Sequence, residues 1–211
     1  MAASIFTPLR RFAATSETVR RWRQQRYLLF EELCDLRPTD TIVDVGAGWG
    51  AALERFNTTN PITAVDLEPD PSSPWLSTPN VTVAQADGTA LPFADRAFDV
   101  AFSNSVIEHV PRARQEAFAA EIRRVADRYY VQTPNRFFPV EPHYQLPLFQ
   151  FLPERLRRAL NRRFTLGWQA KGAWEEITLL SARDLRRLFP DAEIHRERFL
   201  GMTKSLIAVR R

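Results

Sequence analysis

Cysteine, histidine and lysine are all scarce in this chain. Its 211 residues include a single cysteine, Cys34, so neither a disulfide within the chain nor a cysteine-rich zinc site can form. The three histidines, His109, His143 and His195, lie far apart in the sequence, and this scatter predicts no metal site. We therefore expect an intracellular, cytoplasmic protein that is stabilised by packing alone.

Long apolar runs are also missing. None approaches the roughly 18 residues that a membrane-spanning helix requires. Only two of the 29 basic residues are lysines, and 25 acidic residues are interspersed among them, so no block of five like charges occurs. The basic pI of about 9.7 is compatible with an anionic partner without specifying one. Peripheral contact of the arginine-rich segment 153–164 with an anionic membrane surface stays open, and nucleic acid is not favoured as a partner.

From residue 41 onward, short β-branched segments alternate with helical patterns, which is typical of a parallel sheet with crossover helices. The segments 193–199 and 205–209 at the end of the chain indicate an antiparallel hairpin. We predict an α/β fold, a Rossmann-like seven-stranded and mostly parallel sheet with helices on both faces, built as one domain over residues 1–211. The other expected strands are 41–45, 62–66, 81–85, 98–103 and 128–132, and the expected helices are 50–56, 112–126 and 181–188.

Two segments extend this core. Residues 1–38 are predicted to contain an amphipathic helix that leads into the first strand and ends by Pro38; their arginine-rich start also has the composition of a mitochondrial transit peptide, but the helix is favoured. Residues 134–178 combine prolines with aromatic residues and are predicted to be an insertion that caps a substrate site. A short helix is expected within it at 153–164.

The first strand runs into a glycine turn that begins with Gly46, Ala47 and Gly48. Glycine allows the backbone to turn sharply and to approach a ligand closely. The pattern also fits the fingerprint of dinucleotide-binding proteins, in which an acid at the end of the next strand binds a ribose. Asp66 stands 20 residues after Gly46 and fits either type of cofactor.

Asp44, two residues before the turn, favours a cationic ligand. A buried carboxylate without a partner is costly, and a pyrophosphate would not compensate it. S-adenosylmethionine carries both an ammonium and a sulfonium and would supply the missing positive charge. The alternative is that Asp44 only caps the loop through backbone N–H groups.

Together with Asp66, with Asp87-Gly88 after the third strand and with the segment 98–110, this turn resembles the class I S-adenosylmethionine-dependent methyltransferases, in particular the type-11 group of small-molecule methyltransferases. The resemblance covers residues 41–133 and is looser beyond. It implies that S-adenosyl-L-methionine is the cofactor and that Asp66 binds its ribose hydroxyls and Asp87 its adenine amino group. The implied cofactor-binding residues are Asp44, Gly46, Ala47, Gly48, Asp66, Leu67, Asp87, Gly88 and Asn104.

The methyl acceptor must be recognised outside these strands. His109 follows the fourth strand and His143 lies in the insertion, and both are candidates for acid-base catalysis or acceptor contact, with a structural role as the alternative. The place after the fourth strand reads Ser103-Asn104-Ser105-Val106, without the Pro-Pro-aromatic motif of adenine methyltransferases acting on nucleic acids. We predict a methyltransferase for a small molecule or the end of a larger metabolite. An NAD(P)-dependent oxidoreductase and a non-catalytic partner protein of the same fold remain as alternatives, and the oligomeric state is not specified.

Overall fold

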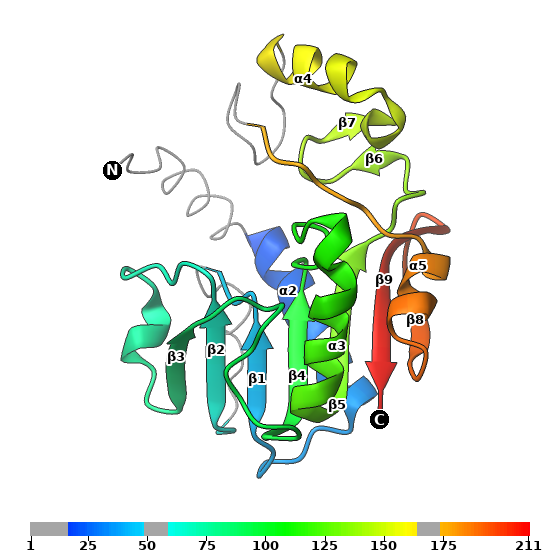
Figure 1. Cartoon of the computed structure of the whole chain (residues 1–211). Helices are drawn as coiled ribbons and strands as arrows, with labels where there is room; N and C mark the ends of the chain where they lie inside the picture. The colour runs from blue at the N-terminus through cyan, green and yellow to red at the C-terminus, as the bar shows by residue number, and fades with distance from the viewer. Residues whose placement is uncertain (1–16, 49–58, 164–173) are drawn as a thin grey trace.

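A seven-stranded sheet with strand order β3-β2-β1-β4-β5-β9-β8 forms the centre of the molecule (Figure 1). The computed structural model describes residues 17–48, 59–163 and 174–211. β1 to β5 run parallel, while β9 pairs antiparallel with both β5 and β8, as the sequence predicts. The strands are β1 Ile42–Val45, β2 Ile62–Asp66, β3 Val81–Gln85, β4 Phe98–Asn104, β5 Ala126–Pro134, β8 Glu193–Phe199 and β9 Met202–Arg210.

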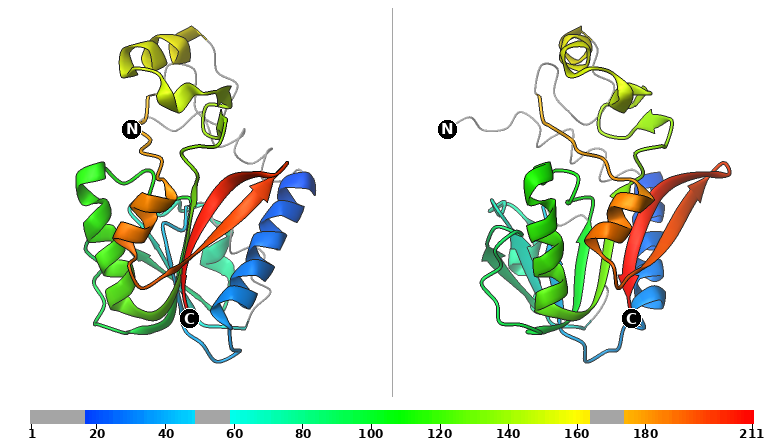
Figure 2. Two further views of the ribbon diagram at one scale, coloured as in Figure 1. Left: turned by 90° about the vertical axis from the view of Figure 1, so that its right-hand side faces the viewer. Right: turned by 45° about the vertical axis from the view of Figure 1, so that its right-hand side comes forward.

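Helices cover both faces of the sheet (Figure 2). On one face lies α2 (Glu17–Cys34), whose Phe30 ring packs edge-on against Phe102 of β4 and Tyr130 of β5, with ring centroids 4.9 and 5.5 Å apart. On the other face lie α3 (Gln115–Val125) and α5 (Ala182–Leu188), which bury an apolar stripe against the alternate residues of the same strands. α5 begins with a capping box between Ser181 and Asp184.

The expected helices are largely present. The segment predicted as a helix at 112–126 starts with a 3-10 turn, η3 (Arg112–Arg114), and gives way to β5 at Ala126. A further 3-10 turn, η2 (Pro74–Ser77), precedes β3. The helix expected at 50–56 lies outside the described residues. No helix among the described residues is both long and apolar enough to cross a membrane.

The segment that follows β5 rises above the carboxyl ends of the parallel strands (Figures 1 and 2). It contains a two-stranded hairpin, β6 (Val140–Glu141) and β7 (Leu146–Pro147), then η4 (Phe149–Phe151) and α4 (Glu154–Arg163). At its base the backbone N–H of Arg136 donates to the carbonyl of Leu180, which ties the start of the segment to the chain that returns to α5. The hairpin was not expected from the sequence, whereas α4 matches the helix predicted at 153–164.

Candidate functional site

The turn after β1 is built on two glycines with positive φ. Gly46 has φ +80° and Gly48 has φ +57°. The N–H groups of Gly46 and Ala47 both donate to the carbonyl of Val65 in β2, at 2.8 and 3.0 Å. A Cβ placed on Gly46 would lie 2.3 Å from Cγ2 of Val106. The turn therefore fits closely against the loop that follows β4, and only glycine fits there.

Asp44 lies directly beneath this turn and is 2% exposed. Its Oδ2 atom has no hydrogen-bond partner among the described residues. Burial, with a smaller effect from the charge of Asp66, raises the pKa of Asp44 to about 8. No backbone N–H among the described residues donates to this atom, so the capping role that the alternative requires does not account for it. The site thus holds a buried carboxyl group that a cationic ligand would stabilise in its ionised form.

Asp66 stands at the end of β2, next to Asp44. Its Oδ2 accepts from the N–H of Gly48 at 2.7 Å, and its Oδ1 accepts from the N–H of Glu68 at 3.0 Å. Each carboxylate oxygen can accept a second bond, so the backbone fixes the side chain while leaving acceptor capacity for ligand hydroxyls. Leu67, the next residue, is exposed.

Asp87 and Gly88 follow β3 and are engaged by the protein itself. The N–H and the hydroxyl of Thr89 donate to Asp87 Oδ1, and Arg114 forms an ion pair with Oδ2 at 3.0 Å. These bonds lower the pKa of Asp87, the two from Thr89 most strongly. A Cβ on Gly88 would lie 2.8 Å from the ring of Phe118 on α3, so packing already explains that glycine. Their contact with a cofactor remains a prediction.

Asn104 ends β4, two residues beyond Phe102, which is the register partner of Asp44. Side chains alternate along a strand, so Asn104 and Asp44 share one face of the sheet at its carboxyl edge. The Oδ1 atom of Asn104 is buried and makes no hydrogen bond within the part of the chain that the structure describes. Two oxygens that lack a partner among the described residues therefore lie on one face of the sheet at its carboxyl edge, where open α/β sheets bind their ligands.

Glu108 lies in the loop after β4 and is fully buried. The hydroxyl of Thr133 donates to its Oε2 at 2.9 Å, whereas its Oε1 makes no hydrogen bond among the described residues. Nε2 of His143 lies 4.0 Å from this Oε1 atom. Burial raises the pKa of Glu108, opposed by the nearby His109 and His143. Sequence analysis did not single out Glu108, because a glutamate beside a strand end carries no signal of its burial.

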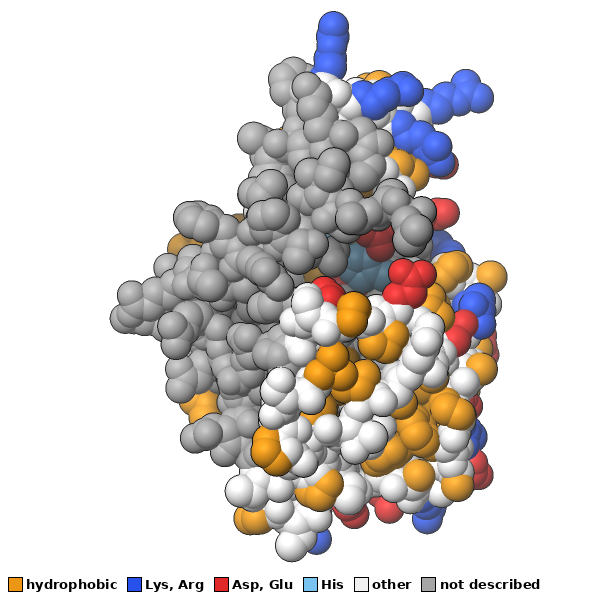
Figure 3. All heavy atoms as spheres, turned by 90° about the vertical axis from the view of Figure 1, so that its left-hand side faces the viewer, with side chains coloured by type: hydrophobic (Ala, Val, Ile, Leu, Met, Phe, Trp, Pro, Cys, Tyr) orange, Lys and Arg blue, Asp and Glu red, His pale blue; other side chains and the backbone are white. Residues whose placement is uncertain are grey.

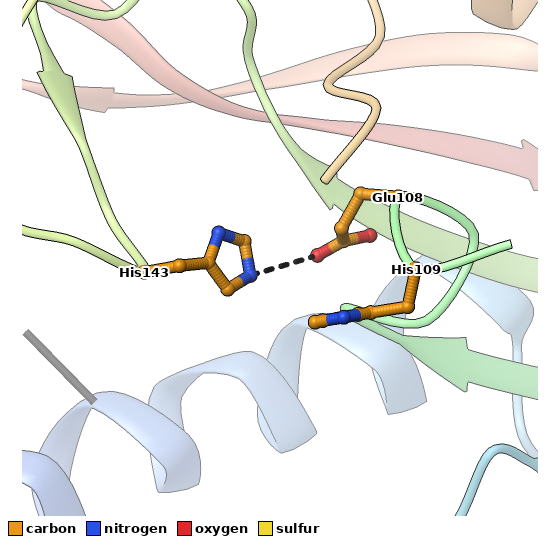
Figure 4. A group of neighbouring side chains, drawn as sticks. All are labelled: Glu108, His109 and His143. Carbon is orange, nitrogen blue, oxygen red and sulfur yellow. Dashed lines mark ion pairs between the residues drawn. The ribbon is translucent and has the colours of Figure 1, made fainter. Parts of the chain in front are cut away.

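His109 and His143 meet although 34 positions separate them in the sequence. Their rings lie edge to face with centroids 4.9 Å apart, and both histidines lie beside Glu108 (Figure 4). Nδ1 of His109 is 2.5 Å from Glu175 Oε1, and Nδ1 of His143 is 2.6 Å from Glu141 Oε1. The scatter of the histidines in the sequence predicted no metal site, yet the structure brings this pair together, because the β6–β7 hairpin carries His143 over the loop after β4.

The histidine group is accessible from outside. In the space-filling view, histidine side chains lie recessed in a hollow beneath the part of the molecule that holds α4, with acidic side chains around them (Figure 3). His109 keeps about a third of its side-chain surface exposed and His143 about an eighth. The third histidine, His195, belongs to β8 and pairs with Glu193 instead.

A separate polar cavity of about 220 Å³ lies between the insertion and α5. It contains none of the predicted cofactor residues and neither His109 nor His143. Its lining is rich in arginine, with Arg112, Arg136, Arg157 and Arg187 facing Glu176 and Asp184.

Comparison with known proteins shows that part of the chain is similar to a known family. Residues 43–128 match the family model of a methyltransferase domain. An uncharacterized methyltransferase of Mycolicibacterium paratuberculosis is 39% identical over 90 residues, which is 40% of this chain and 34% of that protein. The chain thus matches about a third of the length of that relative.

Solved structures share the fold at low identity. The PH0226 protein of Pyrococcus horikoshii superimposes with a TM-score of 0.63 and 14% identity, covering 93% of this chain and 92% of the other. The 1,6-didemethyltoxoflavin-N1-methyltransferase of Burkholderia thailandensis, with 1,6-didemethyltoxoflavin and S-adenosylhomocysteine bound, gives 0.55 and 15% identity, covering 99% and 92%. These likenesses agree with the fold predicted from the sequence.

Proposed function

We propose that this chain, which carries a class I methyltransferase domain, transfers a methyl group from S-adenosyl-L-methionine to a small molecule or to the end of a larger metabolite. The observation that carries the proposal is the buried Asp44 carboxyl, whose Oδ2 has no partner among the described residues and faces the site beneath the glycine turn. The cofactor supplies an electrophilic methyl group on a positively charged sulfur. A cationic ligand would restore the charge balance that the fold leaves open at Asp44.

The residues at the carboxyl edge fit the parts of that cofactor. Asp44 and Asn104 would hold the amino-acid end, together with the turn at Gly46, Ala47 and Gly48. Asp66, oriented by the N–H of Gly48, would accept bonds from both ribose hydroxyls. Asp87, Gly88 and Leu67 would border the adenine.

The acceptor would lie between this edge and the segment 134–178, which we propose as the cap of the site. His143 is held at Nδ1 by Glu141, so its Nε2 faces Glu108 and is the ring nitrogen available to take a proton from an acceptor. His109, held by Glu175, is the second candidate. A small-molecule acceptor is supported by the Burkholderia protein of the same fold, which holds one. The cytoplasmic location stays a prediction.

The two alternatives make different predictions. A nicotinamide-dependent oxidoreductase would bind a pyrophosphate at the turn, where the carboxyl of Asp44 offers nothing favourable. If S-adenosylhomocysteine raises the melting temperature of the chain and NAD(H) does not, the result supports the proposal; the reverse result would refute it. A non-catalytic partner protein would bind the cofactor without turnover.

Replacing Asp66 with alanine is expected to weaken the binding of S-adenosylhomocysteine at least tenfold, because two hydroxyl contacts to an ionised acceptor are lost at roughly 1.5 to 3 kcal/mol each. Calorimetric titration measures this loss. Asp99→Ala is the matched control, since Asp99 also accepts a backbone N–H, that of Thr41, but at the opposite end of the sheet. If the two folded variants bind S-adenosylhomocysteine with equal affinity, Asp66 does not contact the cofactor.

The proposed activity is tested by incubating the purified chain with methyl-labelled S-adenosylmethionine and a fractionated extract of small metabolites. We expect label in a product whose mass exceeds that of its precursor by one methylene unit. If the wild type binds the cofactor but no fraction yields a labelled product, the result would favour the alternative that the chain is a non-catalytic partner protein. Absence of cofactor binding would refute the proposal itself.

A further inference from the structure

We propose that Glu108, His109 and His143 form a binding site for a divalent transition-metal ion of the zinc type. One ligand atom from each of the three residues can be chosen so that all three atoms lie within 4.8 Å of one another (Figure 4). One carboxylate and two imidazoles are a donor set that proteins use for zinc, iron and related ions, and not for magnesium or calcium, which take oxygen ligands.

The ring of His143 is oriented as in a metal ligand. Its Nδ1 lies 2.6 Å from Glu141 Oε1, which fixes Nδ1 as the protonated nitrogen and leaves Nε2 as the acceptor atom. That Nε2 faces Oε1 of Glu108. Glu175 bonds to Nδ1 of His109 in the same way. Carboxylates that hold the second ring nitrogen of a histidine are the usual outer partners of metal ligands, because they set the tautomer and make the ring more basic.

The side chain of Glu108 gives an independent indication of a metal site. Its Oε1 is buried and makes no hydrogen bond among the described residues, and the 4.0 Å separation from Nε2 of His143 is too long for one. Two ligands held at about 2.1 Å by a tetrahedral ion lie roughly 3.4 Å apart. Less than 1 Å of side-chain movement would thus bring both atoms to bonding distance of one ion. The ion would satisfy the oxygen that the fold leaves without a partner.

Three protein ligands would leave a fourth position for a water or a substrate oxygen. The loop after β4 places that position at the edge where the acceptor would lie, which rests on the proposed function. There the ion, in place of His143, would promote loss of the acceptor proton: it would lower the pKa of a bound acceptor hydroxyl, so that the proton leaves to solvent. The alkoxide oxygen would then bond to the methyl carbon while the carbon–sulfur bond breaks and S-adenosylhomocysteine leaves. Binding of the ion itself does not depend on methyl transfer.

The test uses the full chain, stripped of metal with a chelator and then titrated with Co²⁺, whose visible absorption reports the ligand geometry, and with Zn²⁺ in a calorimeter. We expect one ion per chain and an intense cobalt band typical of tetrahedral sites. His143→Ala and Glu108→Gln should each weaken binding at least a hundredfold, and Glu141→Gln by 10- to 100-fold, as for other outer partners of ligating histidines. His195→Ala is the control, because that histidine pairs with a glutamate elsewhere, and its affinity should not change.

Failure to bind either ion at micromolar concentration would overturn the proposal, as would affinities that are equal in the wild type and in His143→Ala. Glu108 is fully buried, so its variant could unfold; the more exposed His143 and the outer Glu141 keep the test decisive in that case. Titration of the same samples with S-adenosylhomocysteine reports on the proposed function separately. A chain that binds zinc but not the cofactor would retain the metal site and refute the methyltransferase.

Discussion

Replacing Asp44 with asparagine is expected to stabilise the cofactor-free chain and at the same time to remove most of its affinity for S-adenosylmethionine. Burial raises the pKa of Asp44 from 3.8 to about 8. At pH 7 the carboxyl of the unfolded chain has lost its proton and that of the folded chain still holds it, at a cost of about 1.4 kcal/mol for each pKa unit between 3.8 and 7. Asparagine removes that cost, which is on the order of 4 kcal/mol.

The pH dependence follows from the direction of this shift. Because the folded-state pKa is raised, the contribution of Asp44 to stability is fully present below about pH 4 and is lost progressively as the pH rises to about 8. The gain in melting temperature from Asp44→Asn should therefore be several degrees at pH 7 and vanish near pH 4. Thermal unfolding at both pH values measures it.

Cofactor binding should show the opposite dependence. A cation stabilises the ionised carboxyl, so binding at pH 7 should release a proton from Asp44, and affinity should rise between pH 6 and 8. The asparagine variant should bind at least tenfold more weakly and release no proton from this position, which calorimetry in buffers of different ionisation enthalpy detects.

Asp40→Asn is the control, because its expected effect on stability is opposite to that of Asp44→Asn. Asp40 is also buried, but it pairs with Arg128 at 2.7 Å and accepts the N–H of Arg37 at 2.6 Å. Asp40→Asn leaves the arginine without its counter-ion and should lower the melting temperature. If Asp44→Asn destabilises the chain as much as Asp40→Asn does, then Asp44 has a structural partner and the cofactor argument fails.

Five of the seven strands of the main sheet could be predicted to within one residue, because each is a short segment bounded by turn residues. Residues 62–66, 81–85 and 193–199 match their expected bounds, and β1 differs by one residue. β9 begins three residues earlier than expected, at Met202. β5 is longer than expected and begins directly after α3, because no turn residue separates helix from strand. The β6–β7 hairpin was not predicted, since two-residue strands carry no periodicity.

The residues of the candidate site also divide into those that the sequence predicts and those that it does not. Asp44, Asp66 and Asn104 follow from position, because the ends of parallel strands meet at one edge and each residue sits at such an end. The pairing of His109 with His143 depends on how the hairpin folds back, and Glu175 reaches His109 across 66 positions. No local pattern encodes those contacts, so sequence alone could name the two histidines but not bring them together.

Gly46→Ala is expected to cost several kcal/mol of stability, the largest effect of a single methyl group at this site. At φ +80° an alanine is strained by about 1 to 2 kcal/mol. The new Cβ would also lie 2.3 Å from Cγ2 and 2.5 Å from Cγ1 of Val106, and overpacking of this kind adds about 1 to 3 kcal/mol. Gly48→Ala is the matched control, because Gly48 has positive φ and none of the described residues lies within 4 Å of its would-be Cβ, so only the backbone strain applies among them.

Val106→Ala in the Gly46→Ala background should recover most of the stability lost to the clash, but not the stability lost to backbone strain. Denaturant unfolding of the wild type, the two single variants and the double variant forms a double-mutant cycle that measures the coupling between the two positions. Val106 stands two residues before Glu108, so the clash in Gly46→Ala should displace the loop that carries Glu108 and His109. The double variant should regain affinity for both S-adenosylhomocysteine and Co²⁺. Equal stability of Gly46→Ala and Gly48→Ala would show that the loop after β4 moves freely against the glycine turn, and the two halves of the site would then be independent.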